Sequence, residues 1–302
     1  MKKMELIKID CPICGIDTPY DVKYEANFKL ESLDFAAKKI SQHMYFRNVK
    51  CKKCSLIYSN PIIPFEQIKQ FYQTTYFLEL NQLEIMANDY EKLFYKHIPN
   101  ISENTNVLEV GCANGLFLKR LKKRGIKNFK GVEPSREAYA VTDDIIKTDV
   151  VNDFLGNNLF ENNSFDVACS FQTFDHVLEP NDFLQKIYKY IKPGGYFLQV
   201  HHNVNSLLPT LLGSKASTFD VEHIHLWSPK TMKLILKKNG FEIIKIKNIT
   251  TGYLFGHALE RLPLFPFLKK NLIKLSKWLK LNEITIRFPV ENMVVVSRKK
   301  NV

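Results

Sequence analysis

The sequence predicts an α/β fold of the doubly wound type, with a mostly parallel sheet and a small N-terminal module held by four cysteines. From about residue 106 onward, short apolar runs alternate with helical patterns, which is typical of βαβ units. A glycine-containing turn follows the first apolar run, at the place where open α/β sheets bind nucleotides. Two Cys-x-x-Cys pairs stand ahead of this region. The 302 residues suffice to bury a sizeable core.

The N-terminal cysteines have the spacing of a zinc site. Cys11 and Cys14 form the first pair, and Cys51 and Cys54 form the second after a spacer of 36 residues. Two such turns complete a tetrahedral sulfur shell with no open position, which indicates a structural rather than a catalytic zinc. A redox pair is the alternative, but the thioredoxin-like strand–helix junction that it needs is not evident. Residues 1–64 are therefore predicted to form a zinc-binding module.

Two helices are predicted between this module and the main domain, in a helical linker over residues 65–100. Phe65 to about Tyr76 has aromatic residues at helical positions, and apolar residues recur at helical spacing over about residues 81–98. The methionine and aromatic stripe of the second helix is interpreted as core packing.

The main domain, over residues 101–302, is predicted from alternating elements. The strands are expected at residues 107–110, 129–133, 164–171, 196–200, 241–247 and 292–297, and the helices at 115–121, 180–191 and 231–239. Strands that are separated by helices in this way pair in parallel.

The turn after the first strand points to a nucleoside ligand without phosphate. It reads Glu109-Val-Gly111-Cys-Ala-Asn-Gly115, and the GxGxxG pattern that a pyrophosphate requires is absent. Eighteen residues past Gly115, Glu133 ends the second strand, where an acid can accept both ribose hydroxyls. The two acids together would surround a cationic nucleoside, and S-adenosylmethionine is such a ligand. Glu109 would then serve its ammonium group.

Four motifs in order resemble the class I S-adenosylmethionine-dependent methyltransferases. They are Glu109–Gly115, Gly131-Val-Glu-Pro-Ser135, Ser164-Phe-Asp-Val167 and Ile191-Lys-Pro-Gly-Gly195. The segments Cys51–Pro61 and Phe71–Phe77 look like the zinc-binding N-terminal module of a bacterial subset of these enzymes. The resemblance implies a Rossmann-like, seven-stranded sheet. It also implies a cofactor site made of Glu109, Gly111, Cys112, Ala113, Gly115, Glu133, Pro134, Asn152, Asp153, Phe171 and Gln172, with Asn152 and Asp153 at the adenine and Phe171 and Gln172 at the methionine end.

Histidines cluster where loops meet the carboxyl edge of the predicted sheet. His176, His201, His202, His223 and His225 are candidates for a base that removes a proton from the acceptor. For each of them alone, a loop hydrogen bond or a helix cap is the alternative role. The resemblance extends to members that methylate carbon of nucleotide-linked keto-sugars, which share His176 and the pair Glu222–His223. These three residues are therefore predicted to be catalytic.

The predicted acceptor is a small molecule, namely a nucleotide- or lipid-linked sugar of bacterial surface-polysaccharide or secondary-metabolite synthesis. The keto-sugar enzymes have a tyrosine at the position of Asp220, so methylation of carbon, oxygen or nitrogen stays open. A nucleic acid is not expected as the partner, because Ser170-Phe-Gln-Thr173 lacks the Asn/Asp-Pro-Pro-aromatic motif of base methylation. An RNA methyltransferase and a non-catalytic binding protein on the same scaffold are the alternatives.

Charge is distributed unevenly toward the C-terminus. The net charge is +12, and we interpret most of it as solvated lysines. Within an insertion over about residues 252–283, the segment 264–280 has five lysines, no acid and an apolar stripe. We expect it to pack on the sheet with its lysines outward; contact with an anionic membrane is the alternative. No signal-peptide or membrane-spanning run is present, so a cytoplasmic location is predicted.

Overall fold

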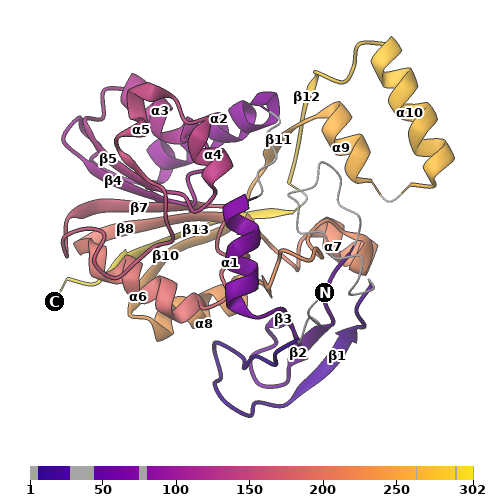
Figure 1. Ribbon diagram of the computed structural model, residues 1–302, viewed down its shortest axis with the longest axis horizontal. Helices are drawn as coiled ribbons and strands as arrows, with labels where there is room; N and C mark the ends of the chain where they lie inside the picture. The colour runs from indigo at the N-terminus through magenta and orange to yellow at the C-terminus, as the bar shows by residue number, and fades with distance from the viewer. Residues whose placement is uncertain (1–5, 28–43, 75–79, 263, 290, 302) are drawn as a thin grey trace.

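A seven-stranded sheet forms the centre of the protein in a computed structural model that describes residues 6–27, 44–74, 80–262, 264–289 and 291–301 (Figure 1). Its strands are β4 (Asn106–Val110), β5 (Asn128–Val132), β6 (Val150–Val151), β7 (Phe165–Phe171), β8 (Ile191–His202), β10 (Phe241–Asn248) and β13 (Asn292–Lys299). They lie in the order β10-β13-β8-β7-β4-β5-β6. The five strands from β8 to β6 pair in parallel, and β13 pairs antiparallel with both of its neighbours. The predicted fold class is confirmed.

Helices cover both faces of this sheet, because its strands are apolar on both sides. Neighbouring residues of β4 belong to different cores: Val107 packs with α3 (Leu116–Lys123) and Leu108 packs with α6 (Pro180–Tyr190) and α8 (Pro229–Lys238). Side chains alternate across a strand, so these two cores lie on opposite faces. Figure 1 shows α3 with the short helices α4 (Arg136–Ala140) and α5 (Asp144–Lys147) on one side and α6 and α8 on the other.

Both helices of the predicted linker are present. α2 (Leu80–His97) packs against α3, and its Phe94 belongs to the same core as Val107. α1 (Phe65–Thr74) ends where the described residues break off, so Tyr76 lies outside them. Both helices begin within one residue of their predicted starts, because aromatic and apolar side chains recur there at helical spacing.

The N-terminal module forms a second sheet that a later segment of the chain completes. Its strands are β1 (Tyr20–Tyr24), β2 (Asn48–Cys51) and β3 (Ile57–Ser59), and β9 (His225–Leu226) adds to β3 in antiparallel fashion. β9 lies some 160 residues further along the chain. β9, from the predicted main domain, thus pairs with a strand of the predicted N-terminal module, across the boundary that we predict at residue 64.

An insertion lies between β10 and β13, as predicted, but it does not pack as predicted. It consists of β11 (Thr251–Leu254), α9 (Phe255–Arg261), α10 (Pro266–Trp278) and β12 (Thr285–Phe288), and β11 and β12 form a two-stranded sheet of their own. α10 packs against α9 and stands away from the central sheet (Figure 1). The expectation that this segment packs on the sheet is therefore wrong, because its own hairpin carries it outward.

Two further helical turns, α7 (Leu207–Leu212) and a 3-10 turn at Gly213–Lys215, follow β8. Among the described residues, no helix combines the length and the apolar character that crossing a bilayer requires.

Candidate functional site

The turn after β4 brings its backbone close to two neighbouring segments. Gly111 has a φ of 75°, and a Cβ there would lie 2.2 Å from the Thr173 hydroxyl oxygen. Gly115 has a φ of 74°, and a Cβ there would lie 2.4 Å from the side chain of Ile146. Both positions therefore exclude a side chain. Ala113 has a φ of 48°, and its N–H donates to Glu133 Oε2 at 2.8 Å, which offsets part of the cost of that left-handed backbone.

Two acids end neighbouring parallel strands beside this turn. Glu133 follows β5, and its Oε1 accepts from the backbone N–H of Ser135 at 2.8 Å. Glu109 lies in β4 and is buried, and its Oε2 has no hydrogen-bond partner among the described residues. Burial raises the pKa of both carboxyl groups, and the charge of Glu133 raises the pKa of Glu109 further. A cation placed between them would stabilise both ionised forms.

These acids line a cavity of about 630 Å³, which is within the usual range for small-molecule sites. Ten of the predicted site residues line it: Glu109, Gly111, Cys112, Ala113, Glu133, Pro134, Phe171, Gln172, His176 and Glu222. Gly115 instead faces Ile146, and its contribution is the start of α3. The structure thus brings most of the predicted set to one cavity.

The predicted adenine contacts lie outside the cavity lining. The Asn152 amide donates to the backbone carbonyls of Glu133 and Ser135, and Asp153 accepts from the N–H of Phe154. Phe154 and Leu155 line the cavity in their place. Asn152 and Asp153 are used to hold the turn, so the loop residues that face the cavity stand further along the chain.

Aromatic packing shapes the wall of the cavity near β7. Phe171 stacks on Tyr90 of α2, with ring centroids 4.2 Å apart and planes 9° apart. Gln172 has a φ of 50°, and its side-chain amide donates to Asn292 Oδ1 at 3.1 Å. Left-handed backbone at a non-glycine residue is common at ligand sites, where the surroundings hold it in place.

A group of ionisable side chains stands at the other part of the cavity. A 2.9 Å hydrogen bond joins the Tyr72 hydroxyl to Nδ1 of His176, and Glu222 Oε2 lies 3.9 Å from the same nitrogen. Burial and the neighbouring His223 lower the pKa of His176 to about 4, whereas burial and Asp220 raise the pKa of Glu222 to about 8. At neutral pH both groups are uncharged, so the short distance between them is not an ion pair.

Behind this group, the candidate base His202 pairs with Asp175, a residue that the sequence alone does not single out. Asp175 Oδ2 lies 2.7 Å from Nδ1 of His202, and although burial raises the pKa of Asp175, the hydrogen bond to His202 brings it well below its usual range. The ring of His223 lies 4.7 Å from that of His202 and 4.8 Å from that of His176, measured between centroids. His223 does not line the cavity but connects the two groups. Such contacts have no signal in the sequence, because they join segments that are distant along the chain.

The remaining histidines have local roles. Nδ1 of His201 bonds to its neighbour's carbonyl, and Nδ1 of His225 bonds to the carbonyl of Val177. Both rings are buried, and neither lines the cavity. The alternative role, a loop hydrogen bond, therefore describes these two.

The N-terminal module holds the segment that carries Glu222 and His223. Ser59 of β3 donates its N–H to the carbonyl of Ile224 at 2.8 Å, and Ile224 in turn donates to the carbonyl of Asp175 at 2.9 Å. The ring of His225 stacks on Tyr58. We call His176, His202 and His223, together with Asp175 and Glu222, the histidine group. The segment that carries two of its members is hydrogen-bonded to β3, which follows the second cysteine pair.

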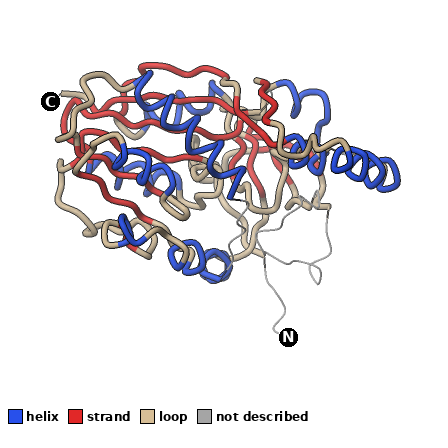
Figure 2. Tube along the Cα trace, turned by 90° about the horizontal axis from the view of Figure 1, so that it is seen from above, coloured by secondary structure: helices blue, strands red, loops and turns tan. Residues whose placement is uncertain are grey.

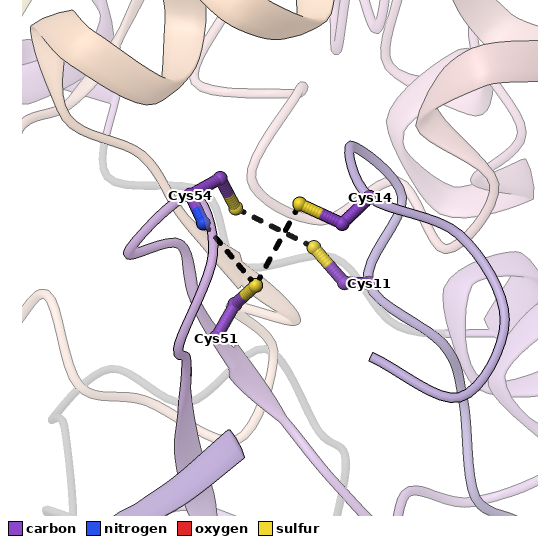
Figure 3. A group of neighbouring side chains, drawn as sticks. All are labelled: Cys11, Cys14, Cys51 and Cys54. Carbon is purple, nitrogen blue, oxygen red and sulfur yellow. Dashed lines mark hydrogen bonds between the residues drawn. The ribbon is translucent and has the colours of Figure 1, made fainter. Parts of the chain in front are cut away.

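The four cysteines converge on one point (Figure 3). The sulfurs of Cys11 and Cys54 lie 3.5 Å apart and those of Cys51 and Cys14 lie 3.7 Å apart, and all four are free thiols. Zinc–sulfur bonds of about 2.3 Å in a tetrahedron require sulfur separations near ~3.8 Å. The cluster therefore has nearly the dimensions of a tetrahedral zinc site.

Comparison with curated proteins finds methyltransferases that match part of the chain. One is the EEF1A lysine methyltransferase 2 of Danio rerio, 32% identical over 114 residues, or 33% of this chain and 48% of that protein. Another is the mitochondrial ubiquinone biosynthesis O-methyltransferase of Dictyostelium discoideum, 23% identical over 180 residues, or 51% of this chain and 54% of that protein. The chain spans about half the length of these relatives.

Solved structures share the fold. A protein of Bacillus halodurans described as a methyltransferase superposes with a TM-score of 0.53 at 16% identity, over 70% of this chain and 99% of that one. The [4+2]-cyclase SpnF superposes with a TM-score of 0.51 at 15% identity, over 71% of this chain and 81% of that one. At these identities the likeness shows the architecture only.

The family follows from the sequence match and the site together. Residues 80–246, more than half of the chain, match the methyltransferase domain family. This span contains the glycine turn, both strand-end acids and the histidine group. The chain belongs to the methyltransferase domain family, in the class I, S-adenosylmethionine-dependent branch that its four motifs resemble.

Proposed function

We propose that the protein transfers a methyl group from S-adenosylmethionine to a small-molecule acceptor, a sugar or sugar nucleotide of bacterial surface-polysaccharide or secondary-metabolite synthesis. One observation carries this proposal: a single cavity joins the strand-end acids Glu109 and Glu133 to the group of Tyr72, His176 and Glu222. The first part suits a cationic nucleoside, and the second offers hydrogen bonds to an acceptor rich in hydroxyl groups. Fold alone does not determine the reaction, as the cyclase with this architecture illustrates.

The proposed fit of the cofactor rests on carboxylate oxygens that can still accept hydrogen bonds. Each Glu133 oxygen accepts one backbone N–H, which leaves lone pairs for the two ribose hydroxyls. The unpartnered Oε2 of Glu109 suits the methionine ammonium group. Phe154 and Leu155 would contact the adenine, in place of Asn152 and Asp153. When bound, S-adenosylmethionine supplies an electrophilic methyl group, so the chain has to position the acceptor and take its proton.

The histidine group would position the acceptor and take its proton. His176 is neutral at physiological pH because its pKa is about 4, so its ring can accept a proton. Tyr72 orients that ring, and Glu222, protonated below a pKa of about 8, can donate a hydrogen bond to the acceptor. The ring of His223 contacts the ring of His176 on the side away from the cavity, so His223 would act on the acceptor only by positioning His176. His176 and Glu222 would thus act on the acceptor at the cavity, and His223 would position His176 from outside the lining.

His176→Gln is expected to lower turnover by about 100-fold or more, because it removes a general base. Affinity for S-adenosylmethionine should stay within about twofold, since the proposed cofactor contacts are made by Glu109 and Glu133 and not by His176. His223→Ala should likewise spare cofactor binding and abolish turnover. Formation of labelled S-adenosylhomocysteine, measured with a panel of nucleotide sugars and quinols, gives the rate, and calorimetry gives the affinity.

Tyr72→Phe is the matched control, because it keeps the ring and removes only the bond to Nδ1 of His176. Its loss of turnover should be smaller than that of His176→Gln. Unchanged turnover in His176→Gln would remove this residue from the mechanism. Methyl transfer to RNA, with salt-sensitive RNA binding in a gel shift, would replace the small-molecule acceptor by the RNA alternative. Cofactor binding without transfer to any acceptor would favour a binding protein.

Cofactor affinity is expected to rise with pH. The pKa of Glu109 is raised in the free protein by burial and by Glu133, whereas a bound ammonium group favours the ionised carboxylate. Binding therefore releases a proton, and affinity increases until the pH passes the raised pKa. Calorimetry at several pH values measures this slope, and Glu109→Gln should remove most of it. A flat profile in the parent protein would contradict the placement of the ammonium group.

We also propose that Cys11, Cys14, Cys51 and Cys54 hold a structural zinc. The sulfur separations of 3.5 and 3.7 Å support it. Cys11, Cys51 and Cys54 are buried, which suits a closed shell that has no position for a substrate. Residues 1–64 would need this ion because their own core is small.

A further inference from the structure

α10 presents an apolar surface that no described part of the protein covers. α10 packs on α9. Its buried side carries Ser276, which is 3% exposed and whose hydroxyl makes hydrogen bonds within the insertion. On the other side, Phe267 is 79% exposed and Trp278 is 77% exposed. Phe265, just before the helix, is 82% exposed. Single exposed apolar residues are ordinary, but three aromatic rings on one short element indicate an interaction surface.

The exposed apolar residues lie on one side of the helix. Phe267 and Trp278 are 11 residues apart, about three turns, so they point in nearly the same direction. Leu268, Leu275 and Leu279 are roughly half exposed and widen this arc. The result is a continuous apolar strip along the length of α10.

A row of lysines runs beside this strip. Lys270, Lys274 and Lys277 are exposed, and their spacing of four and three residues aligns them along the helix. α10 contains no acid, and Lys280 continues the positive charge beyond its end. An apolar arc flanked by lysines, with aromatic residues at its ends, is the pattern of helices that lie in the interface of an anionic bilayer.

The insertion is attached firmly to a helix that lines the cavity. Gln82 of α2 donates to the carbonyl of Gly252 at 3.1 Å and accepts from the N–H of Leu254 at 2.9 Å. Asp89 of α2 accepts from Arg287 of β12 at 2.8 Å. Met86, one turn after Gln82, and Tyr90, next to Asp89, contribute to the cavity wall from the same helix. α10 therefore stands at a defined position relative to the cavity, and Figures 1 and 2 both show a helix that projects from that edge of the molecule.

We propose that this face of α10 docks on an anionic lipid bilayer, with Phe267 and Trp278 in the interface and the lysine row on lipid phosphates. A second copy of the chain fits the face less well, because a symmetric contact would bring the same lysines against each other. This docking does not depend on methyl transfer. Its consequence, that a lipid-linked acceptor would reach the cavity at the membrane, rests on the proposed function.

Trp278 makes the docking directly measurable. The chain has two tryptophans, and Trp227 is fully buried, so a change in emission on lipid addition reports Trp278. With vesicles of equal parts phosphatidylcholine and phosphatidylglycerol at low salt, we expect a blue shift and co-sedimentation. The protein should bind vesicles of phosphatidylcholine alone at least about tenfold more weakly than anionic vesicles. Added salt should release it from the anionic vesicles.

Two sets of variants separate this surface from charge in general. Lys270→Glu, Lys274→Glu and Lys277→Glu together should lower binding by about tenfold or more. The matched control is Lys230→Glu, Lys233→Glu and Lys237→Glu, which changes the same charge on α8, where these lysines are also exposed and are spaced by three and four residues. It should lower binding far less. Phe267→Ser with Trp278→Phe should weaken binding and leave the lysine row intact.

Several outcomes would overturn the proposal. They are absence of binding to anionic vesicles, equal binding to both kinds of vesicle, or equal losses in the two lysine sets. A dimer in solution that Phe267→Ser dissociates would assign the face to a second copy instead. Calorimetric binding of S-adenosylmethionine by each variant shows that it is folded. Because that binding needs no membrane, failure of the docking and failure of the proposed function are distinguishable.

Discussion

Glu133→Ala is expected to weaken the binding of S-adenosylmethionine by at least about 100-fold. Each hydrogen bond to a charged group contributes about 1.5–3 kcal/mol, and the carboxylate would accept two from the ribose. The substitution also leaves the N–H groups of Ala113 and Ser135 without their acceptor, so the turn itself loosens. Isothermal titration calorimetry measures the affinity directly.

Two comparisons sharpen this test. Glu133→Gln keeps the shape and one acceptor oxygen, so its loss should be smaller than that of the alanine variant. Glu137→Ala removes an exposed acid from the first turn of α4, close in sequence, and should leave the affinity unchanged. Unaltered affinity in Glu133→Ala would exclude this carboxylate from the cofactor site.

Loss of the proposed zinc is expected to disturb the histidine group as well as the N-terminal module. Structural zinc contributes about 10–16 kcal/mol to the folding of small modules, so Cys51→Ser should unfold the region around the cluster. β3 would then no longer be held in position. The hydrogen bond from the Ser59 N–H to the carbonyl of Ile224 and the pairing of β3 with β9 would be lost. Residues 222–226 should exchange their amide hydrogens faster, and turnover should fall.

Metal analysis and hydrogen exchange together test this prediction. The parent protein should contain about one zinc per chain, as the closed four-sulfur shell implies. Cys169→Ser is the matched control, because Cys169 is a buried thiol of β7 outside the cluster. It should keep the metal and the slow exchange at residues 222–226. If the Cys51→Ser protein retains both the metal and the slow exchange at residues 222–226, the cluster neither binds the metal nor supports that segment.

The central sheet was predictable because its signals are local. The strands at residues 107–110 and 292–297 are short apolar runs, and each is found within two residues of its predicted ends. The glycine turn and Glu133 could be placed at the cavity because they stand at strand ends, where open α/β sheets bind their ligands. The same local logic does not place the loop after β6, where Asn152 holds the turn and Phe154, two residues further on, lines the cavity.

The remaining features depend on contacts between distant segments. Tyr72 reaches His176 across 104 residues of chain, and Asp175 reaches His202 across 27. Lysines and leucines at helical spacing fit a helix on the sheet as well as one in a projecting hairpin. The hydrogen bonds from Gln82 and Asp89 to the insertion decide between these arrangements.

By itself, the sequence determined the class of fold, the four-cysteine cluster and the two acids, Glu109 and Glu133, at neighbouring strand ends. These depend on the local preferences of short segments, and local preferences are visible as patterns of residue type. Only the tertiary structure decided that β9 completes the sheet of the N-terminal module and so ties the cysteine cluster to Glu222 and His223. The physical reason is that this pairing joins residues that are far apart in the chain, such as Tyr58 and His225, which are 167 residues apart, and backbone hydrogen bonds carry no mark in the side-chain sequence.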